Sequence, residues 1–252
     1  MKKIVNVLWT GGLDSTCRIA ELSQQDVIIQ PYYIMDPSRK SIPYELRAMA
    51  TITELIRKNA KTTAELREII KVELDNIEAD EEISTSYENL RKKYKLGSQY
   101  DFLARFAKQK NMVLEVGLEC SPRSKAYNTI IGECKELVKN KEFNRYEINR
   151  DVTSFDGIHV LERLTYPCTL WHKSKKEEVE YMKSLGLGNL IDKTHFCHNP
   201  IMGLTCGQCN PCKDALKEDM AWRVSILGQI LGILRKYFII YPKSALRRLL
   251  KY

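Results

Sequence analysis

The alternation of apolar and polar residues predicts strands and helices that follow one another along most of the chain. Short apolar runs rich in β-branched residues predict strands, whereas apolar residues that recur every three or four positions predict helices. The predicted strands are residues 4–9, 27–35, 71–77, 112–118 and 157–164, and the predicted helices are residues 15–24, 43–58, 61–69, 100–110, 124–140 and 174–185. Residues 78–96 are polar and poorly periodic, so we expect a loop with a helical turn there. Strands that alternate with helices are typical of a doubly wound α/β fold with a mainly parallel sheet.

The pattern changes near Lys193, where the alternation gives way to a cysteine-rich segment and then to a helical tail. We therefore expect two parts. Residues 1–192 would form the α/β domain, and residues 193–252 would form a metal-stapled helical segment.

The composition is that of a globular protein without a membrane-spanning segment. The chain has 252 residues, of which 44% are hydrophobic and 29% are charged, and these values are ordinary for such proteins. The first apolar run is too short for the core of a signal peptide, and no run reaches the roughly 18 to 20 apolar residues of a membrane span. We expect a cytoplasmic protein whose cysteines are thiols or metal ligands.

The net charge of +8 is unevenly distributed along the chain. Residues 223–252 carry seven basic residues and no acids, so 8 − 7 leaves +1 for residues 1–222. A basic tail of this kind could contact tRNA, acidic lipid or an acidic protein partner.

The stretch NVLWTGGLDSTC, residues 6–17, joins the first predicted strand to the first predicted helix. Gly11 and Gly12 have no Cβ, which lets the backbone turn sharply and approach an anion closely. The helix start supplies amide donors, and Thr10, Ser15 and Thr16 add hydroxyl groups. Neither G-x-x-x-x-G-K-[ST] nor G-x-G-x-x-G is present here. The loop therefore predicts a phosphate or pyrophosphate site of another type.

Four cysteines in the segment after residue 193 have the spacing C-x8-C-x2-C-x2-C. They are Cys197, Cys206, Cys209 and Cys212. Four thiolates within sixteen residues favour a closed, structural Zn²⁺ site, with an iron–sulfur cluster or unliganded redox thiols as alternatives. His195 and His198 flank the first cysteine, and we interpret them as loop residues rather than ligands.

The loop Thr10-Gly11-Gly12-Leu13-Asp14-Ser15 resembles the S-G-G-x-D-S loop of the PP-loop ATP pyrophosphatases, with threonine in place of the first serine. Those enzymes cleave ATP between the α- and β-phosphates and adenylate a substrate. The resemblance implies an adenine nucleotide α-hydrolase-like fold, ATP and Mg²⁺ as cofactors, and Asp14 close to the metal-bound phosphates. The residues that it assigns to nucleotide binding are Thr10, Gly11, Gly12, Leu13, Asp14, Ser15 and Thr16.

Together with the four cysteines, the helix start Ser174-Lys175-Lys176-Glu177 after Pro167 resembles the 7-cyano-7-deazaguanine synthase family of queuosine biosynthesis. This resemblance implies an ATP-dependent C–N ligase. A carboxylate such as 7-carboxy-7-deazaguanine would be adenylated and converted by ammonia to the amide and then the nitrile, with release of AMP and pyrophosphate. It implies Asp14, Ser15 and Lys175 as catalytic residues, with Lys175 offsetting charge on the departing pyrophosphate.

The middle of the chain departs from that family, because ECSPRSKAYN at residues 119–128 stands where the family has an aspartate- and aromatic-rich substrate segment. Arg123 and Lys125 in this stretch could hold an acidic substrate. Three alternatives stay open: an enzyme that joins a carboxylate to another amine, a tRNA-thiolating enzyme that uses Cys120 and Cys168, and a zinc-stapled adaptor without activity.

The C-terminal tail begins with a stretch that is apolar all round, residues 224–241. A helix of this kind is expected to be buried, either in the fold or in the interface of a homodimer. Residues 243–252 form a short basic amphipathic stretch, which we interpret as an accessory patch.

Overall fold

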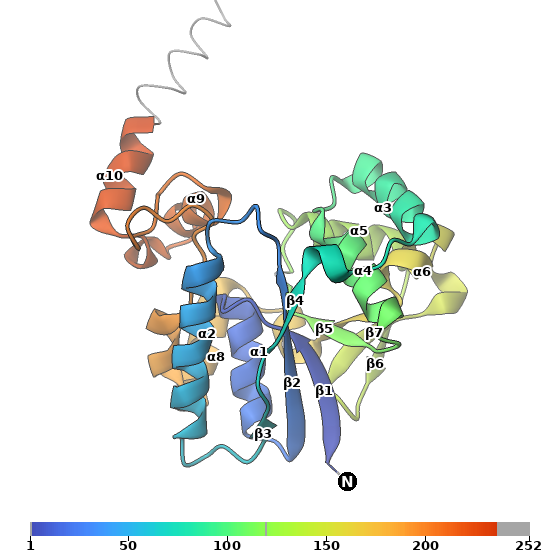
Figure 1. Ribbon diagram of the computed structural model, residues 1–252, viewed down its shortest axis with the longest axis horizontal. Coiled ribbons are helices and arrows are strands. Elements are labelled where there is room, and N and C mark those ends of the chain that lie inside the picture. The colour runs from blue at the N-terminus through green and yellow to red at the C-terminus, as the bar shows by residue number, and fades with distance from the viewer. Residues whose placement is uncertain (1, 119, 236–252) are drawn as a thin grey trace, which may run out of the picture.

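The computed structural model describes residues 2–118 and 120–235, and within these ranges eight strands form one sheet (Figure 1). The parallel strands are β1 (Lys3–Leu8), β2 (Val27–Met35), β3 (Glu65–Leu66), β4 (Ile70–Glu73), β5 (Leu114–Val116) and β8 (Leu164–Pro167). An antiparallel pair, β6 (Leu137–Asn140) and β7 (Arg145–Ile148), extends the sheet beyond β8. The strand order is β3-β2-β1-β5-β8-β7-β6, and β4 also pairs with β2. The mainly parallel sheet predicted from the sequence is confirmed.

Helices cover both faces of this sheet, as a doubly wound fold requires (Figure 1). One face carries α1 (Leu13–Ser23), α2 (Ile42–Arg57) and α8 (Lys175–Ser184). The other carries α3 (Glu81–Tyr94), α4 (Gln99–Gln109), α5 (Lys125–Glu133) and α6 (Phe155–Leu161). A short helix, α7 (Cys168–Trp171), follows β8, and the C-terminal segment contains α9 (Asn210–Lys217) and α10 (Ile226–Arg235).

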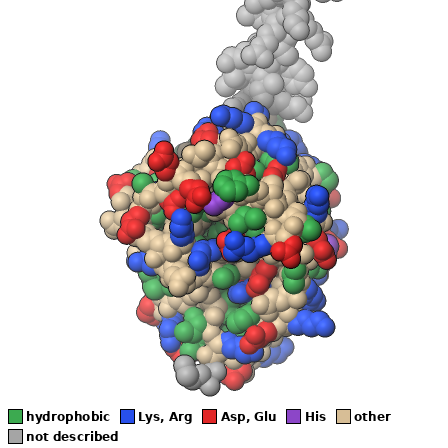
Figure 2. All heavy atoms as spheres, turned by 90° about the vertical axis from the view of Figure 1, so that its right-hand side faces the viewer, with side chains coloured by type: hydrophobic (Ala, Val, Ile, Leu, Met, Phe, Trp, Pro, Cys, Tyr) green, Lys and Arg blue, Asp and Glu red, His purple; other side chains and the backbone are tan. Residues whose placement is uncertain are grey.

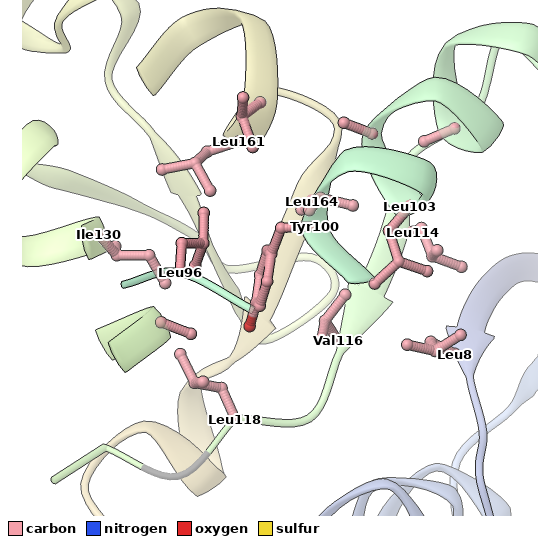
Figure 3. Packing of buried hydrophobic residues seen from close by; sticks show 14 of the residues in the cluster. Leu8, Leu96, Tyr100, Leu103, Leu114, Val116, Leu118, Ile130, Leu161 and Leu164 are labelled. Carbon is pink, nitrogen blue, oxygen red and sulfur yellow. The ribbon is translucent and has the colours of Figure 1, made fainter. Parts of the chain in front are cut away.

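The hydrophobic core is divided between the two faces because side chains alternate along a strand. In β1, Val5 and Val7 belong to the cluster under α1, α2 and α8, whereas Leu8 belongs to the cluster on the opposite face. Figure 3 shows part of this second cluster, in which Tyr100 of α4 lies among aliphatic residues from β5, β8 and the neighbouring helices. The cluster on the first face also contains Ala215 and Met220, so the C-terminal segment packs onto the α/β core.

A buried ion network ties α1 to the middle of the sheet. The guanidinium of Arg18 donates to both carboxylate oxygens of Glu115 in β5, at 2.7 and 3.0 Å, and to Glu21 at 2.8 Å. All three side chains are buried, so each charge is compensated by a partner rather than by water. The network fixes α1, and with it the loop that leads into α1.

Most predicted elements lie within a few residues of their observed positions. The strand 27–35 is β2, the strands 4–9 and 112–118 contain most of β1 and all of β5, and the helices 15–24, 43–58, 100–110 and 174–185 correspond to α1, α2, α4 and α8. The strand 71–77 corresponds to β4 at Ile70–Glu73, followed by a 3-10 turn at Leu74–Asn76.

Two predictions of local structure were wrong because tertiary pairing outweighs local propensity. Residues 61–69 do not form a helix, since Glu65–Leu66 pairs with β2 as β3. The helix predicted for residues 124–140 ends at Glu133, and its second half becomes β6, which is paired with β7. The strand β7 itself was not predicted.

Two helices were missed because their caps were not recognised in the sequence. Residues 78–96 contain α3, where the Asp80 side chain accepts from the amide of Ile83 and starts the helix. The predicted strand 157–164 is largely α6, which begins at a comparable cap on Ser154, and β8 follows only at Leu164.

The prediction that the apolar tail helix is buried within this chain was also wrong. In α10, Ile226, Leu227, Ile230, Ile233 and Leu234 are all between 43% and 78% exposed. Burial in a subunit interface stays a prediction, and the predictions for residues 236–252 lie outside the described residues. No helix among the described residues is both long and apolar enough to cross a bilayer.

Candidate functional site

The loop between β1 and α1 lies where the sheet changes direction of winding. β1 pairs with β2 on one side and with β5 on the other. The chain passes from β1 outward to β2 and β3 and later returns to β5, which makes the carboxyl ends of β1 and β5 a topological switch point. Ligands of open α/β sheets bind in the crevice at this point, so the loop stands where the sequence predicts a phosphate site.

Gly11 is required by the backbone of this loop. Its φ of +69° is in the left-handed region, and a Cβ there would lie 3.1 Å from the carbonyl oxygen of Glu45 in α2. Gly12 is less constrained, because an added Cβ would have no contact closer than 3.4 Å. Gly12 is also the N-cap of α1, and no side-chain capping hydrogen bond is made at this end of the helix.

The loop hydroxyls have different surroundings. Ser15 is buried, and its Oγ accepts from the amide of Thr10 and donates to the carbonyl of Gly12, both at 3.4 Å. Thr16 is fully buried, and its Oγ1 accepts from the indole N–H of Trp9 at 3.0 Å. These two hydroxyls form hydrogen bonds inside the protein that hold the loop in place, whereas Thr10 lines the cavity described below.

Asp14 and Lys175 are 161 positions apart in the sequence and form an ion pair at the loop. Lys175 is the first residue of α8, and that helix starts with a capping box between Ser174 and Glu177. The Lys175 ammonium also lies 3.7 Å from a carboxylate oxygen of Glu178. Burial lowers the pKa of Lys175, an effect that nearby Glu178 opposes. A further anion close to this ammonium would stabilise its charged form.

A cavity of about 370 Å³ opens in front of the loop and this ion pair. Its walls come from the loop, from the region after β2, from the start of α4, from α8 and from the C-terminal segment. The lining residues are Thr10, Gly12, Leu13, Asp14, Arg39, Glu45, Gln99, Lys175, His195, Phe196, His198, Pro211, Asp214, Ala215, Glu218, Met220 and Arg223. The structure thus brings the predicted loop and Lys175 together in one cavity.

Sequence reasoning missed several charged residues of the cavity wall, among them Arg39, Glu45 and Arg223. The buried carboxylate of Glu45 accepts from Tyr33 and from Arg39, both at 2.6 Å, so Arg39 is held at the cavity wall. Arg223 was counted with the basic tail, but its guanidinium donates to Thr194 at 2.6 Å and lies over the ring of Phe196. Burial lowers the pKa of Arg223 to about 10. Nothing in the sequence distinguishes it from the other basic residues of the tail.

The four cysteines predicted as metal ligands converge. The Sγ atoms of Cys197, Cys206, Cys209 and Cys212 all lie within 4.8 Å of one another. Four thiolates bound to one tetrahedral ion at the usual Zn–S distance of about 2.3 Å are separated by about 3.8 Å. A cubane cluster interposes its own iron and sulfide atoms, which would hold the thiolates farther apart. The arrangement therefore fits a single ion such as Zn²⁺.

Backbone amides also donate hydrogen bonds to two of these sulfur atoms, which favours the thiolate form. The amides of Gln208 and Cys209 both donate to the Sγ of Cys206, and the amide of Cys206 donates to Cys197. A hydrogen bond from Cys212 lowers the pKa of Cys209 to about 4, whereas burial raises that of Cys197 to about 11.

Neither flanking histidine belongs to this cluster of ligand atoms, as far as the described residues show. The ring of His195 bonds to the carbonyl of Cys197 and stacks on Tyr44, while His198 lines the cavity.

The alternative cysteines and the substrate segment have other surroundings. Burial raises the pKa of Cys168, which disfavours the thiolate that a thiol nucleophile needs. Arg123 forms an ion pair with Glu218 of the cavity wall at 3.0 Å, so the segment after β5 contacts the C-terminal segment. Lys125 is the first residue of α5.

No protein-family model matches the sequence, and no curated protein matches it. Among solved structures, the U34-tRNA thiolase NcsA from Methanococcus maripaludis with its 4Fe–4S cluster is similar, with 14% identity and a TM-score of 0.44. That match covers 100% of this chain and 73% of the thiolase. A 4-thiouridine synthetase in complex with RNA and bound ATP has 14% identity and a TM-score of 0.39, covering 93% of this chain. This chain spans 52% of the length of the synthetase.

Proposed function

We propose that the protein is an ATP-dependent enzyme of the PP-loop type, which splits ATP into AMP and pyrophosphate while adenylating a carboxylate. The observation that carries the proposal is the meeting of Asp14 and Lys175 at the loop of residues 10–16, in a cavity at the topological switch point. A glycine loop, an uncapped helix start and a lysine are the groups expected around a triphosphate.

The triphosphate would lie over Gly12 and the first turn of α1, where the amides and the helix dipole favour negative charge. Lys175 would move from the Asp14 carboxylate to the phosphates and stabilise the charge that develops on departing pyrophosphate. Asp14 would then contact Mg²⁺, which proteins usually hold through one or two carboxylates and the substrate phosphates. Ser15 would act by holding the loop, since its hydroxyl bonds within the loop.

The acceptor would occupy the part of the cavity bordered by Arg39 and Arg223. Two guanidinium groups at the wall suit a substrate that enters as a carboxylate. The carboxylate oxygen would attack the α-phosphorus, giving an acyl adenylate and pyrophosphate, and ammonia would then displace AMP to give an amide. In its finer form the proposal is that the acceptor is 7-carboxy-7-deazaguanine, and that a second ATP converts the amide to the nitrile.

The four cysteines would hold Zn²⁺ in a structural role. Three of them are buried, and the sulfur geometry leaves no open coordination position at the cavity. The short separations between the four sulfur atoms favour a single ion over an iron–sulfur cluster, and this supports nitrile chemistry over cluster-dependent thiolation. The raised pKa of Cys168 supports the same choice.

The test is an assay with ATP, Mg²⁺, ammonia and 7-carboxy-7-deazaguanine, read by mass spectrometry. We expect AMP, pyrophosphate and the nitrile from the native protein, and a loss of at least about 100-fold in AMP formation from Lys175→Met. Lys176→Met is the matched control, because Lys176 is the next residue and is exposed. Formation of AMP without the nitrile would indicate that the enzyme joins a carboxylate to another amine. Equal activity of the two variants, or iron and sulfide in the purified protein with transfer of sulfur to tRNA, would contradict it.

A further inference from the structure

Helix α8 carries two charged residues on the side that packs into the protein. Lys175, Glu178, Val179 and Met182 occupy positions i, i+3, i+4 and i+7, which is the spacing of a buried helix face. Val179 and Met182 belong to the hydrophobic core that also contains residues of α1. Glu178 therefore stands where an apolar residue is usual, and a carboxylate at such a position is costly unless a positive charge lies near it.

The ammonium of Lys175 contacts two carboxylates that differ in exposure. The side chain of Asp14 is 25% exposed and lines the cavity, so a ligand in the cavity can reach it. A carboxylate oxygen of Glu178 lies 3.7 Å from the same ammonium, but that side chain is 0% exposed and is not one of the described residues that line the cavity. A ligand can therefore replace Lys175 at Asp14 and leave the pair with Glu178 in place.

The position of Glu178 is fixed by the packing of α8 beside α1 (Figure 1). The thiol of Cys17 in α1 lies 3.9 Å from the carbonyl oxygen of Glu178 and donates to it. Elsewhere, on the face that Figure 2 shows, acidic and basic side chains are intermixed in contact with solvent, where ion pairs contribute little. The pair between Lys175 and Glu178 is less screened, because Glu178 is shielded from water.

We propose that Glu178 is a positioning residue, which holds the Lys175 ammonium beside the loop of residues 10–16 after Asp14 has released it. The inference rests on the proposed function, in which Lys175 leaves Asp14 for the phosphates of ATP. Because Lys175 and Glu178 are three residues apart on one helix, their side chains stay neighbours while ligands enter and leave the cavity. An ammonium held in place in this way stabilises the charge on departing pyrophosphate without a further rearrangement.

The experiment is a double-mutant cycle between the two residues, with AMP formation as the first measurement. Glu178→Gln keeps the size of the side chain and removes its charge. We expect it to lower kcat roughly tenfold or more and to change KM for ATP by less than about threefold, because the charge on pyrophosphate develops only in the transition state. In the Lys175→Met background the same substitution should have no further effect. Glu180→Gln is the matched control, since it removes the same charge from an exposed position of α8 and should leave kcat unchanged.

Melting curves are a second measurement, which does not depend on activity. Glu178→Gln should lower the melting temperature, and Lys175→Met/Glu178→Gln should recover part of that loss, because it removes the ammonium as well. If Glu178→Gln does not fold, the double variant decides, and the inference is wrong if that variant does not fold either. A double variant that melts lower than Glu178→Gln would also contradict it.

The kinetic outcomes separate this inference from the proposed function. Full AMP formation by Lys175→Met would contradict the proposed function itself. If Lys175→Met is impaired but Glu178→Gln is as active as Glu180→Gln, only the role of Glu178 is wrong. The role is also wrong if Glu178→Gln lowers kcat equally in the native and Lys175→Met backgrounds. Glu178 would then act through another group such as Arg223, since burial lowers the pKa of Arg223 to about 10 and the charge of Glu178 opposes that effect.

Discussion

The main-chain amide of His195 donates a hydrogen bond of 2.8 Å to the carbonyl oxygen of Gly11. This bond joins the segment that leads into the cysteine cluster to the turn at Gly11 in the loop of residues 10–16. Cys197 follows His195 by only two residues, so a metal held by the cysteines would fix the segment that carries the His195 amide. The cysteine cluster and the loop of residues 10–16 are therefore connected through this hydrogen bond.

Loss of the metal should weaken ATP binding as well as lower stability. In Cys206→Ser, which removes the sulfur that accepts two backbone amides, we expect a lower melting temperature and an ATP Kd raised by roughly three- to tenfold. Calorimetry with ATP and melting curves measure the two effects. Cys168→Ser, outside the cluster, is the control and should change neither. An unchanged ATP Kd in metal-free protein would show that the His195–Gly11 bond does not transmit the effect.

The two loop glycines should respond differently to alanine. Gly11→Ala forces a Cβ into the backbone of α2 at a positive φ, so we expect a loss of about 1–3 kcal/mol in the free energy of unfolding. Gly12→Ala introduces only ordinary contacts and should cost less than about 1 kcal/mol. Urea denaturation of the two variants measures the difference. Equal destabilisation by both would mean that the left-handed turn at Gly11 is not the constraint.

The cap of α3 makes a prediction about pH. The hydrogen bond from Lys108 lowers the pKa of Asp80 below its ordinary value, and the Ile83 amide adds to this effect. A carboxyl with a lowered folded-state pKa contributes stability above its ordinary pKa of about 3.9, and the contribution is lost as the pH falls through the folded value. Asp80→Ala should cost about 1 kcal/mol at neutral pH. Asp80→Asn keeps a capping oxygen and should cost less.

The difference between native protein and Asp80→Asn reports the charge alone. It should be constant from pH 5 to 8 and shrink toward zero in acid below the ordinary carboxyl pKa of about 3.9. Chemical denaturation at several pH values checks this. A difference that persists unchanged in strong acid would mean that the ion pair with Lys108 is not its source.

Sequence reasoning singled out the candidate residues whose local pattern is distinctive and missed the residues that line the same cavity only because of packing. The glycines, Asp14 and the four cysteines are local patterns, and the structure brings them to the switch point and into one cluster. Lys175 was found through the resemblance of its helix start to a family motif. Arg39 and Glu45 carry no such pattern, because their place in the cavity follows from the packing of α2 against the loop.

The errors in local structure have a similar origin. The apolar residues of 157–164 fit a strand or a short helix equally well, and the cap at Ser154 decides for the helix. The tail helix was expected to be buried because it is apolar all round, but only its glycine side is covered within the described residues. Hydropathy reports how apolar a surface is and does not report which partner covers it.

A substitution of Arg223 tests whether this residue acts in the cavity or only adds to the charge of the basic tail. Its guanidinium is held over Phe196 at 4.5 Å and bonded to Thr194, so its charge reaches the cavity in a fixed position. If an anionic substrate binds there, Arg223→Gln should lower kcat/KM for AMP formation by roughly 10- to 100-fold, mainly through KM for the carboxylate. Arg247→Gln changes the charge of the tail by the same amount and should leave this reaction unaffected. Steady-state kinetics with varied carboxylate concentration measure both variants, and melting curves show whether Arg223→Gln remains folded. Equal kinetics for the two variants, with both folded, would place the substrate carboxylate elsewhere in the cavity.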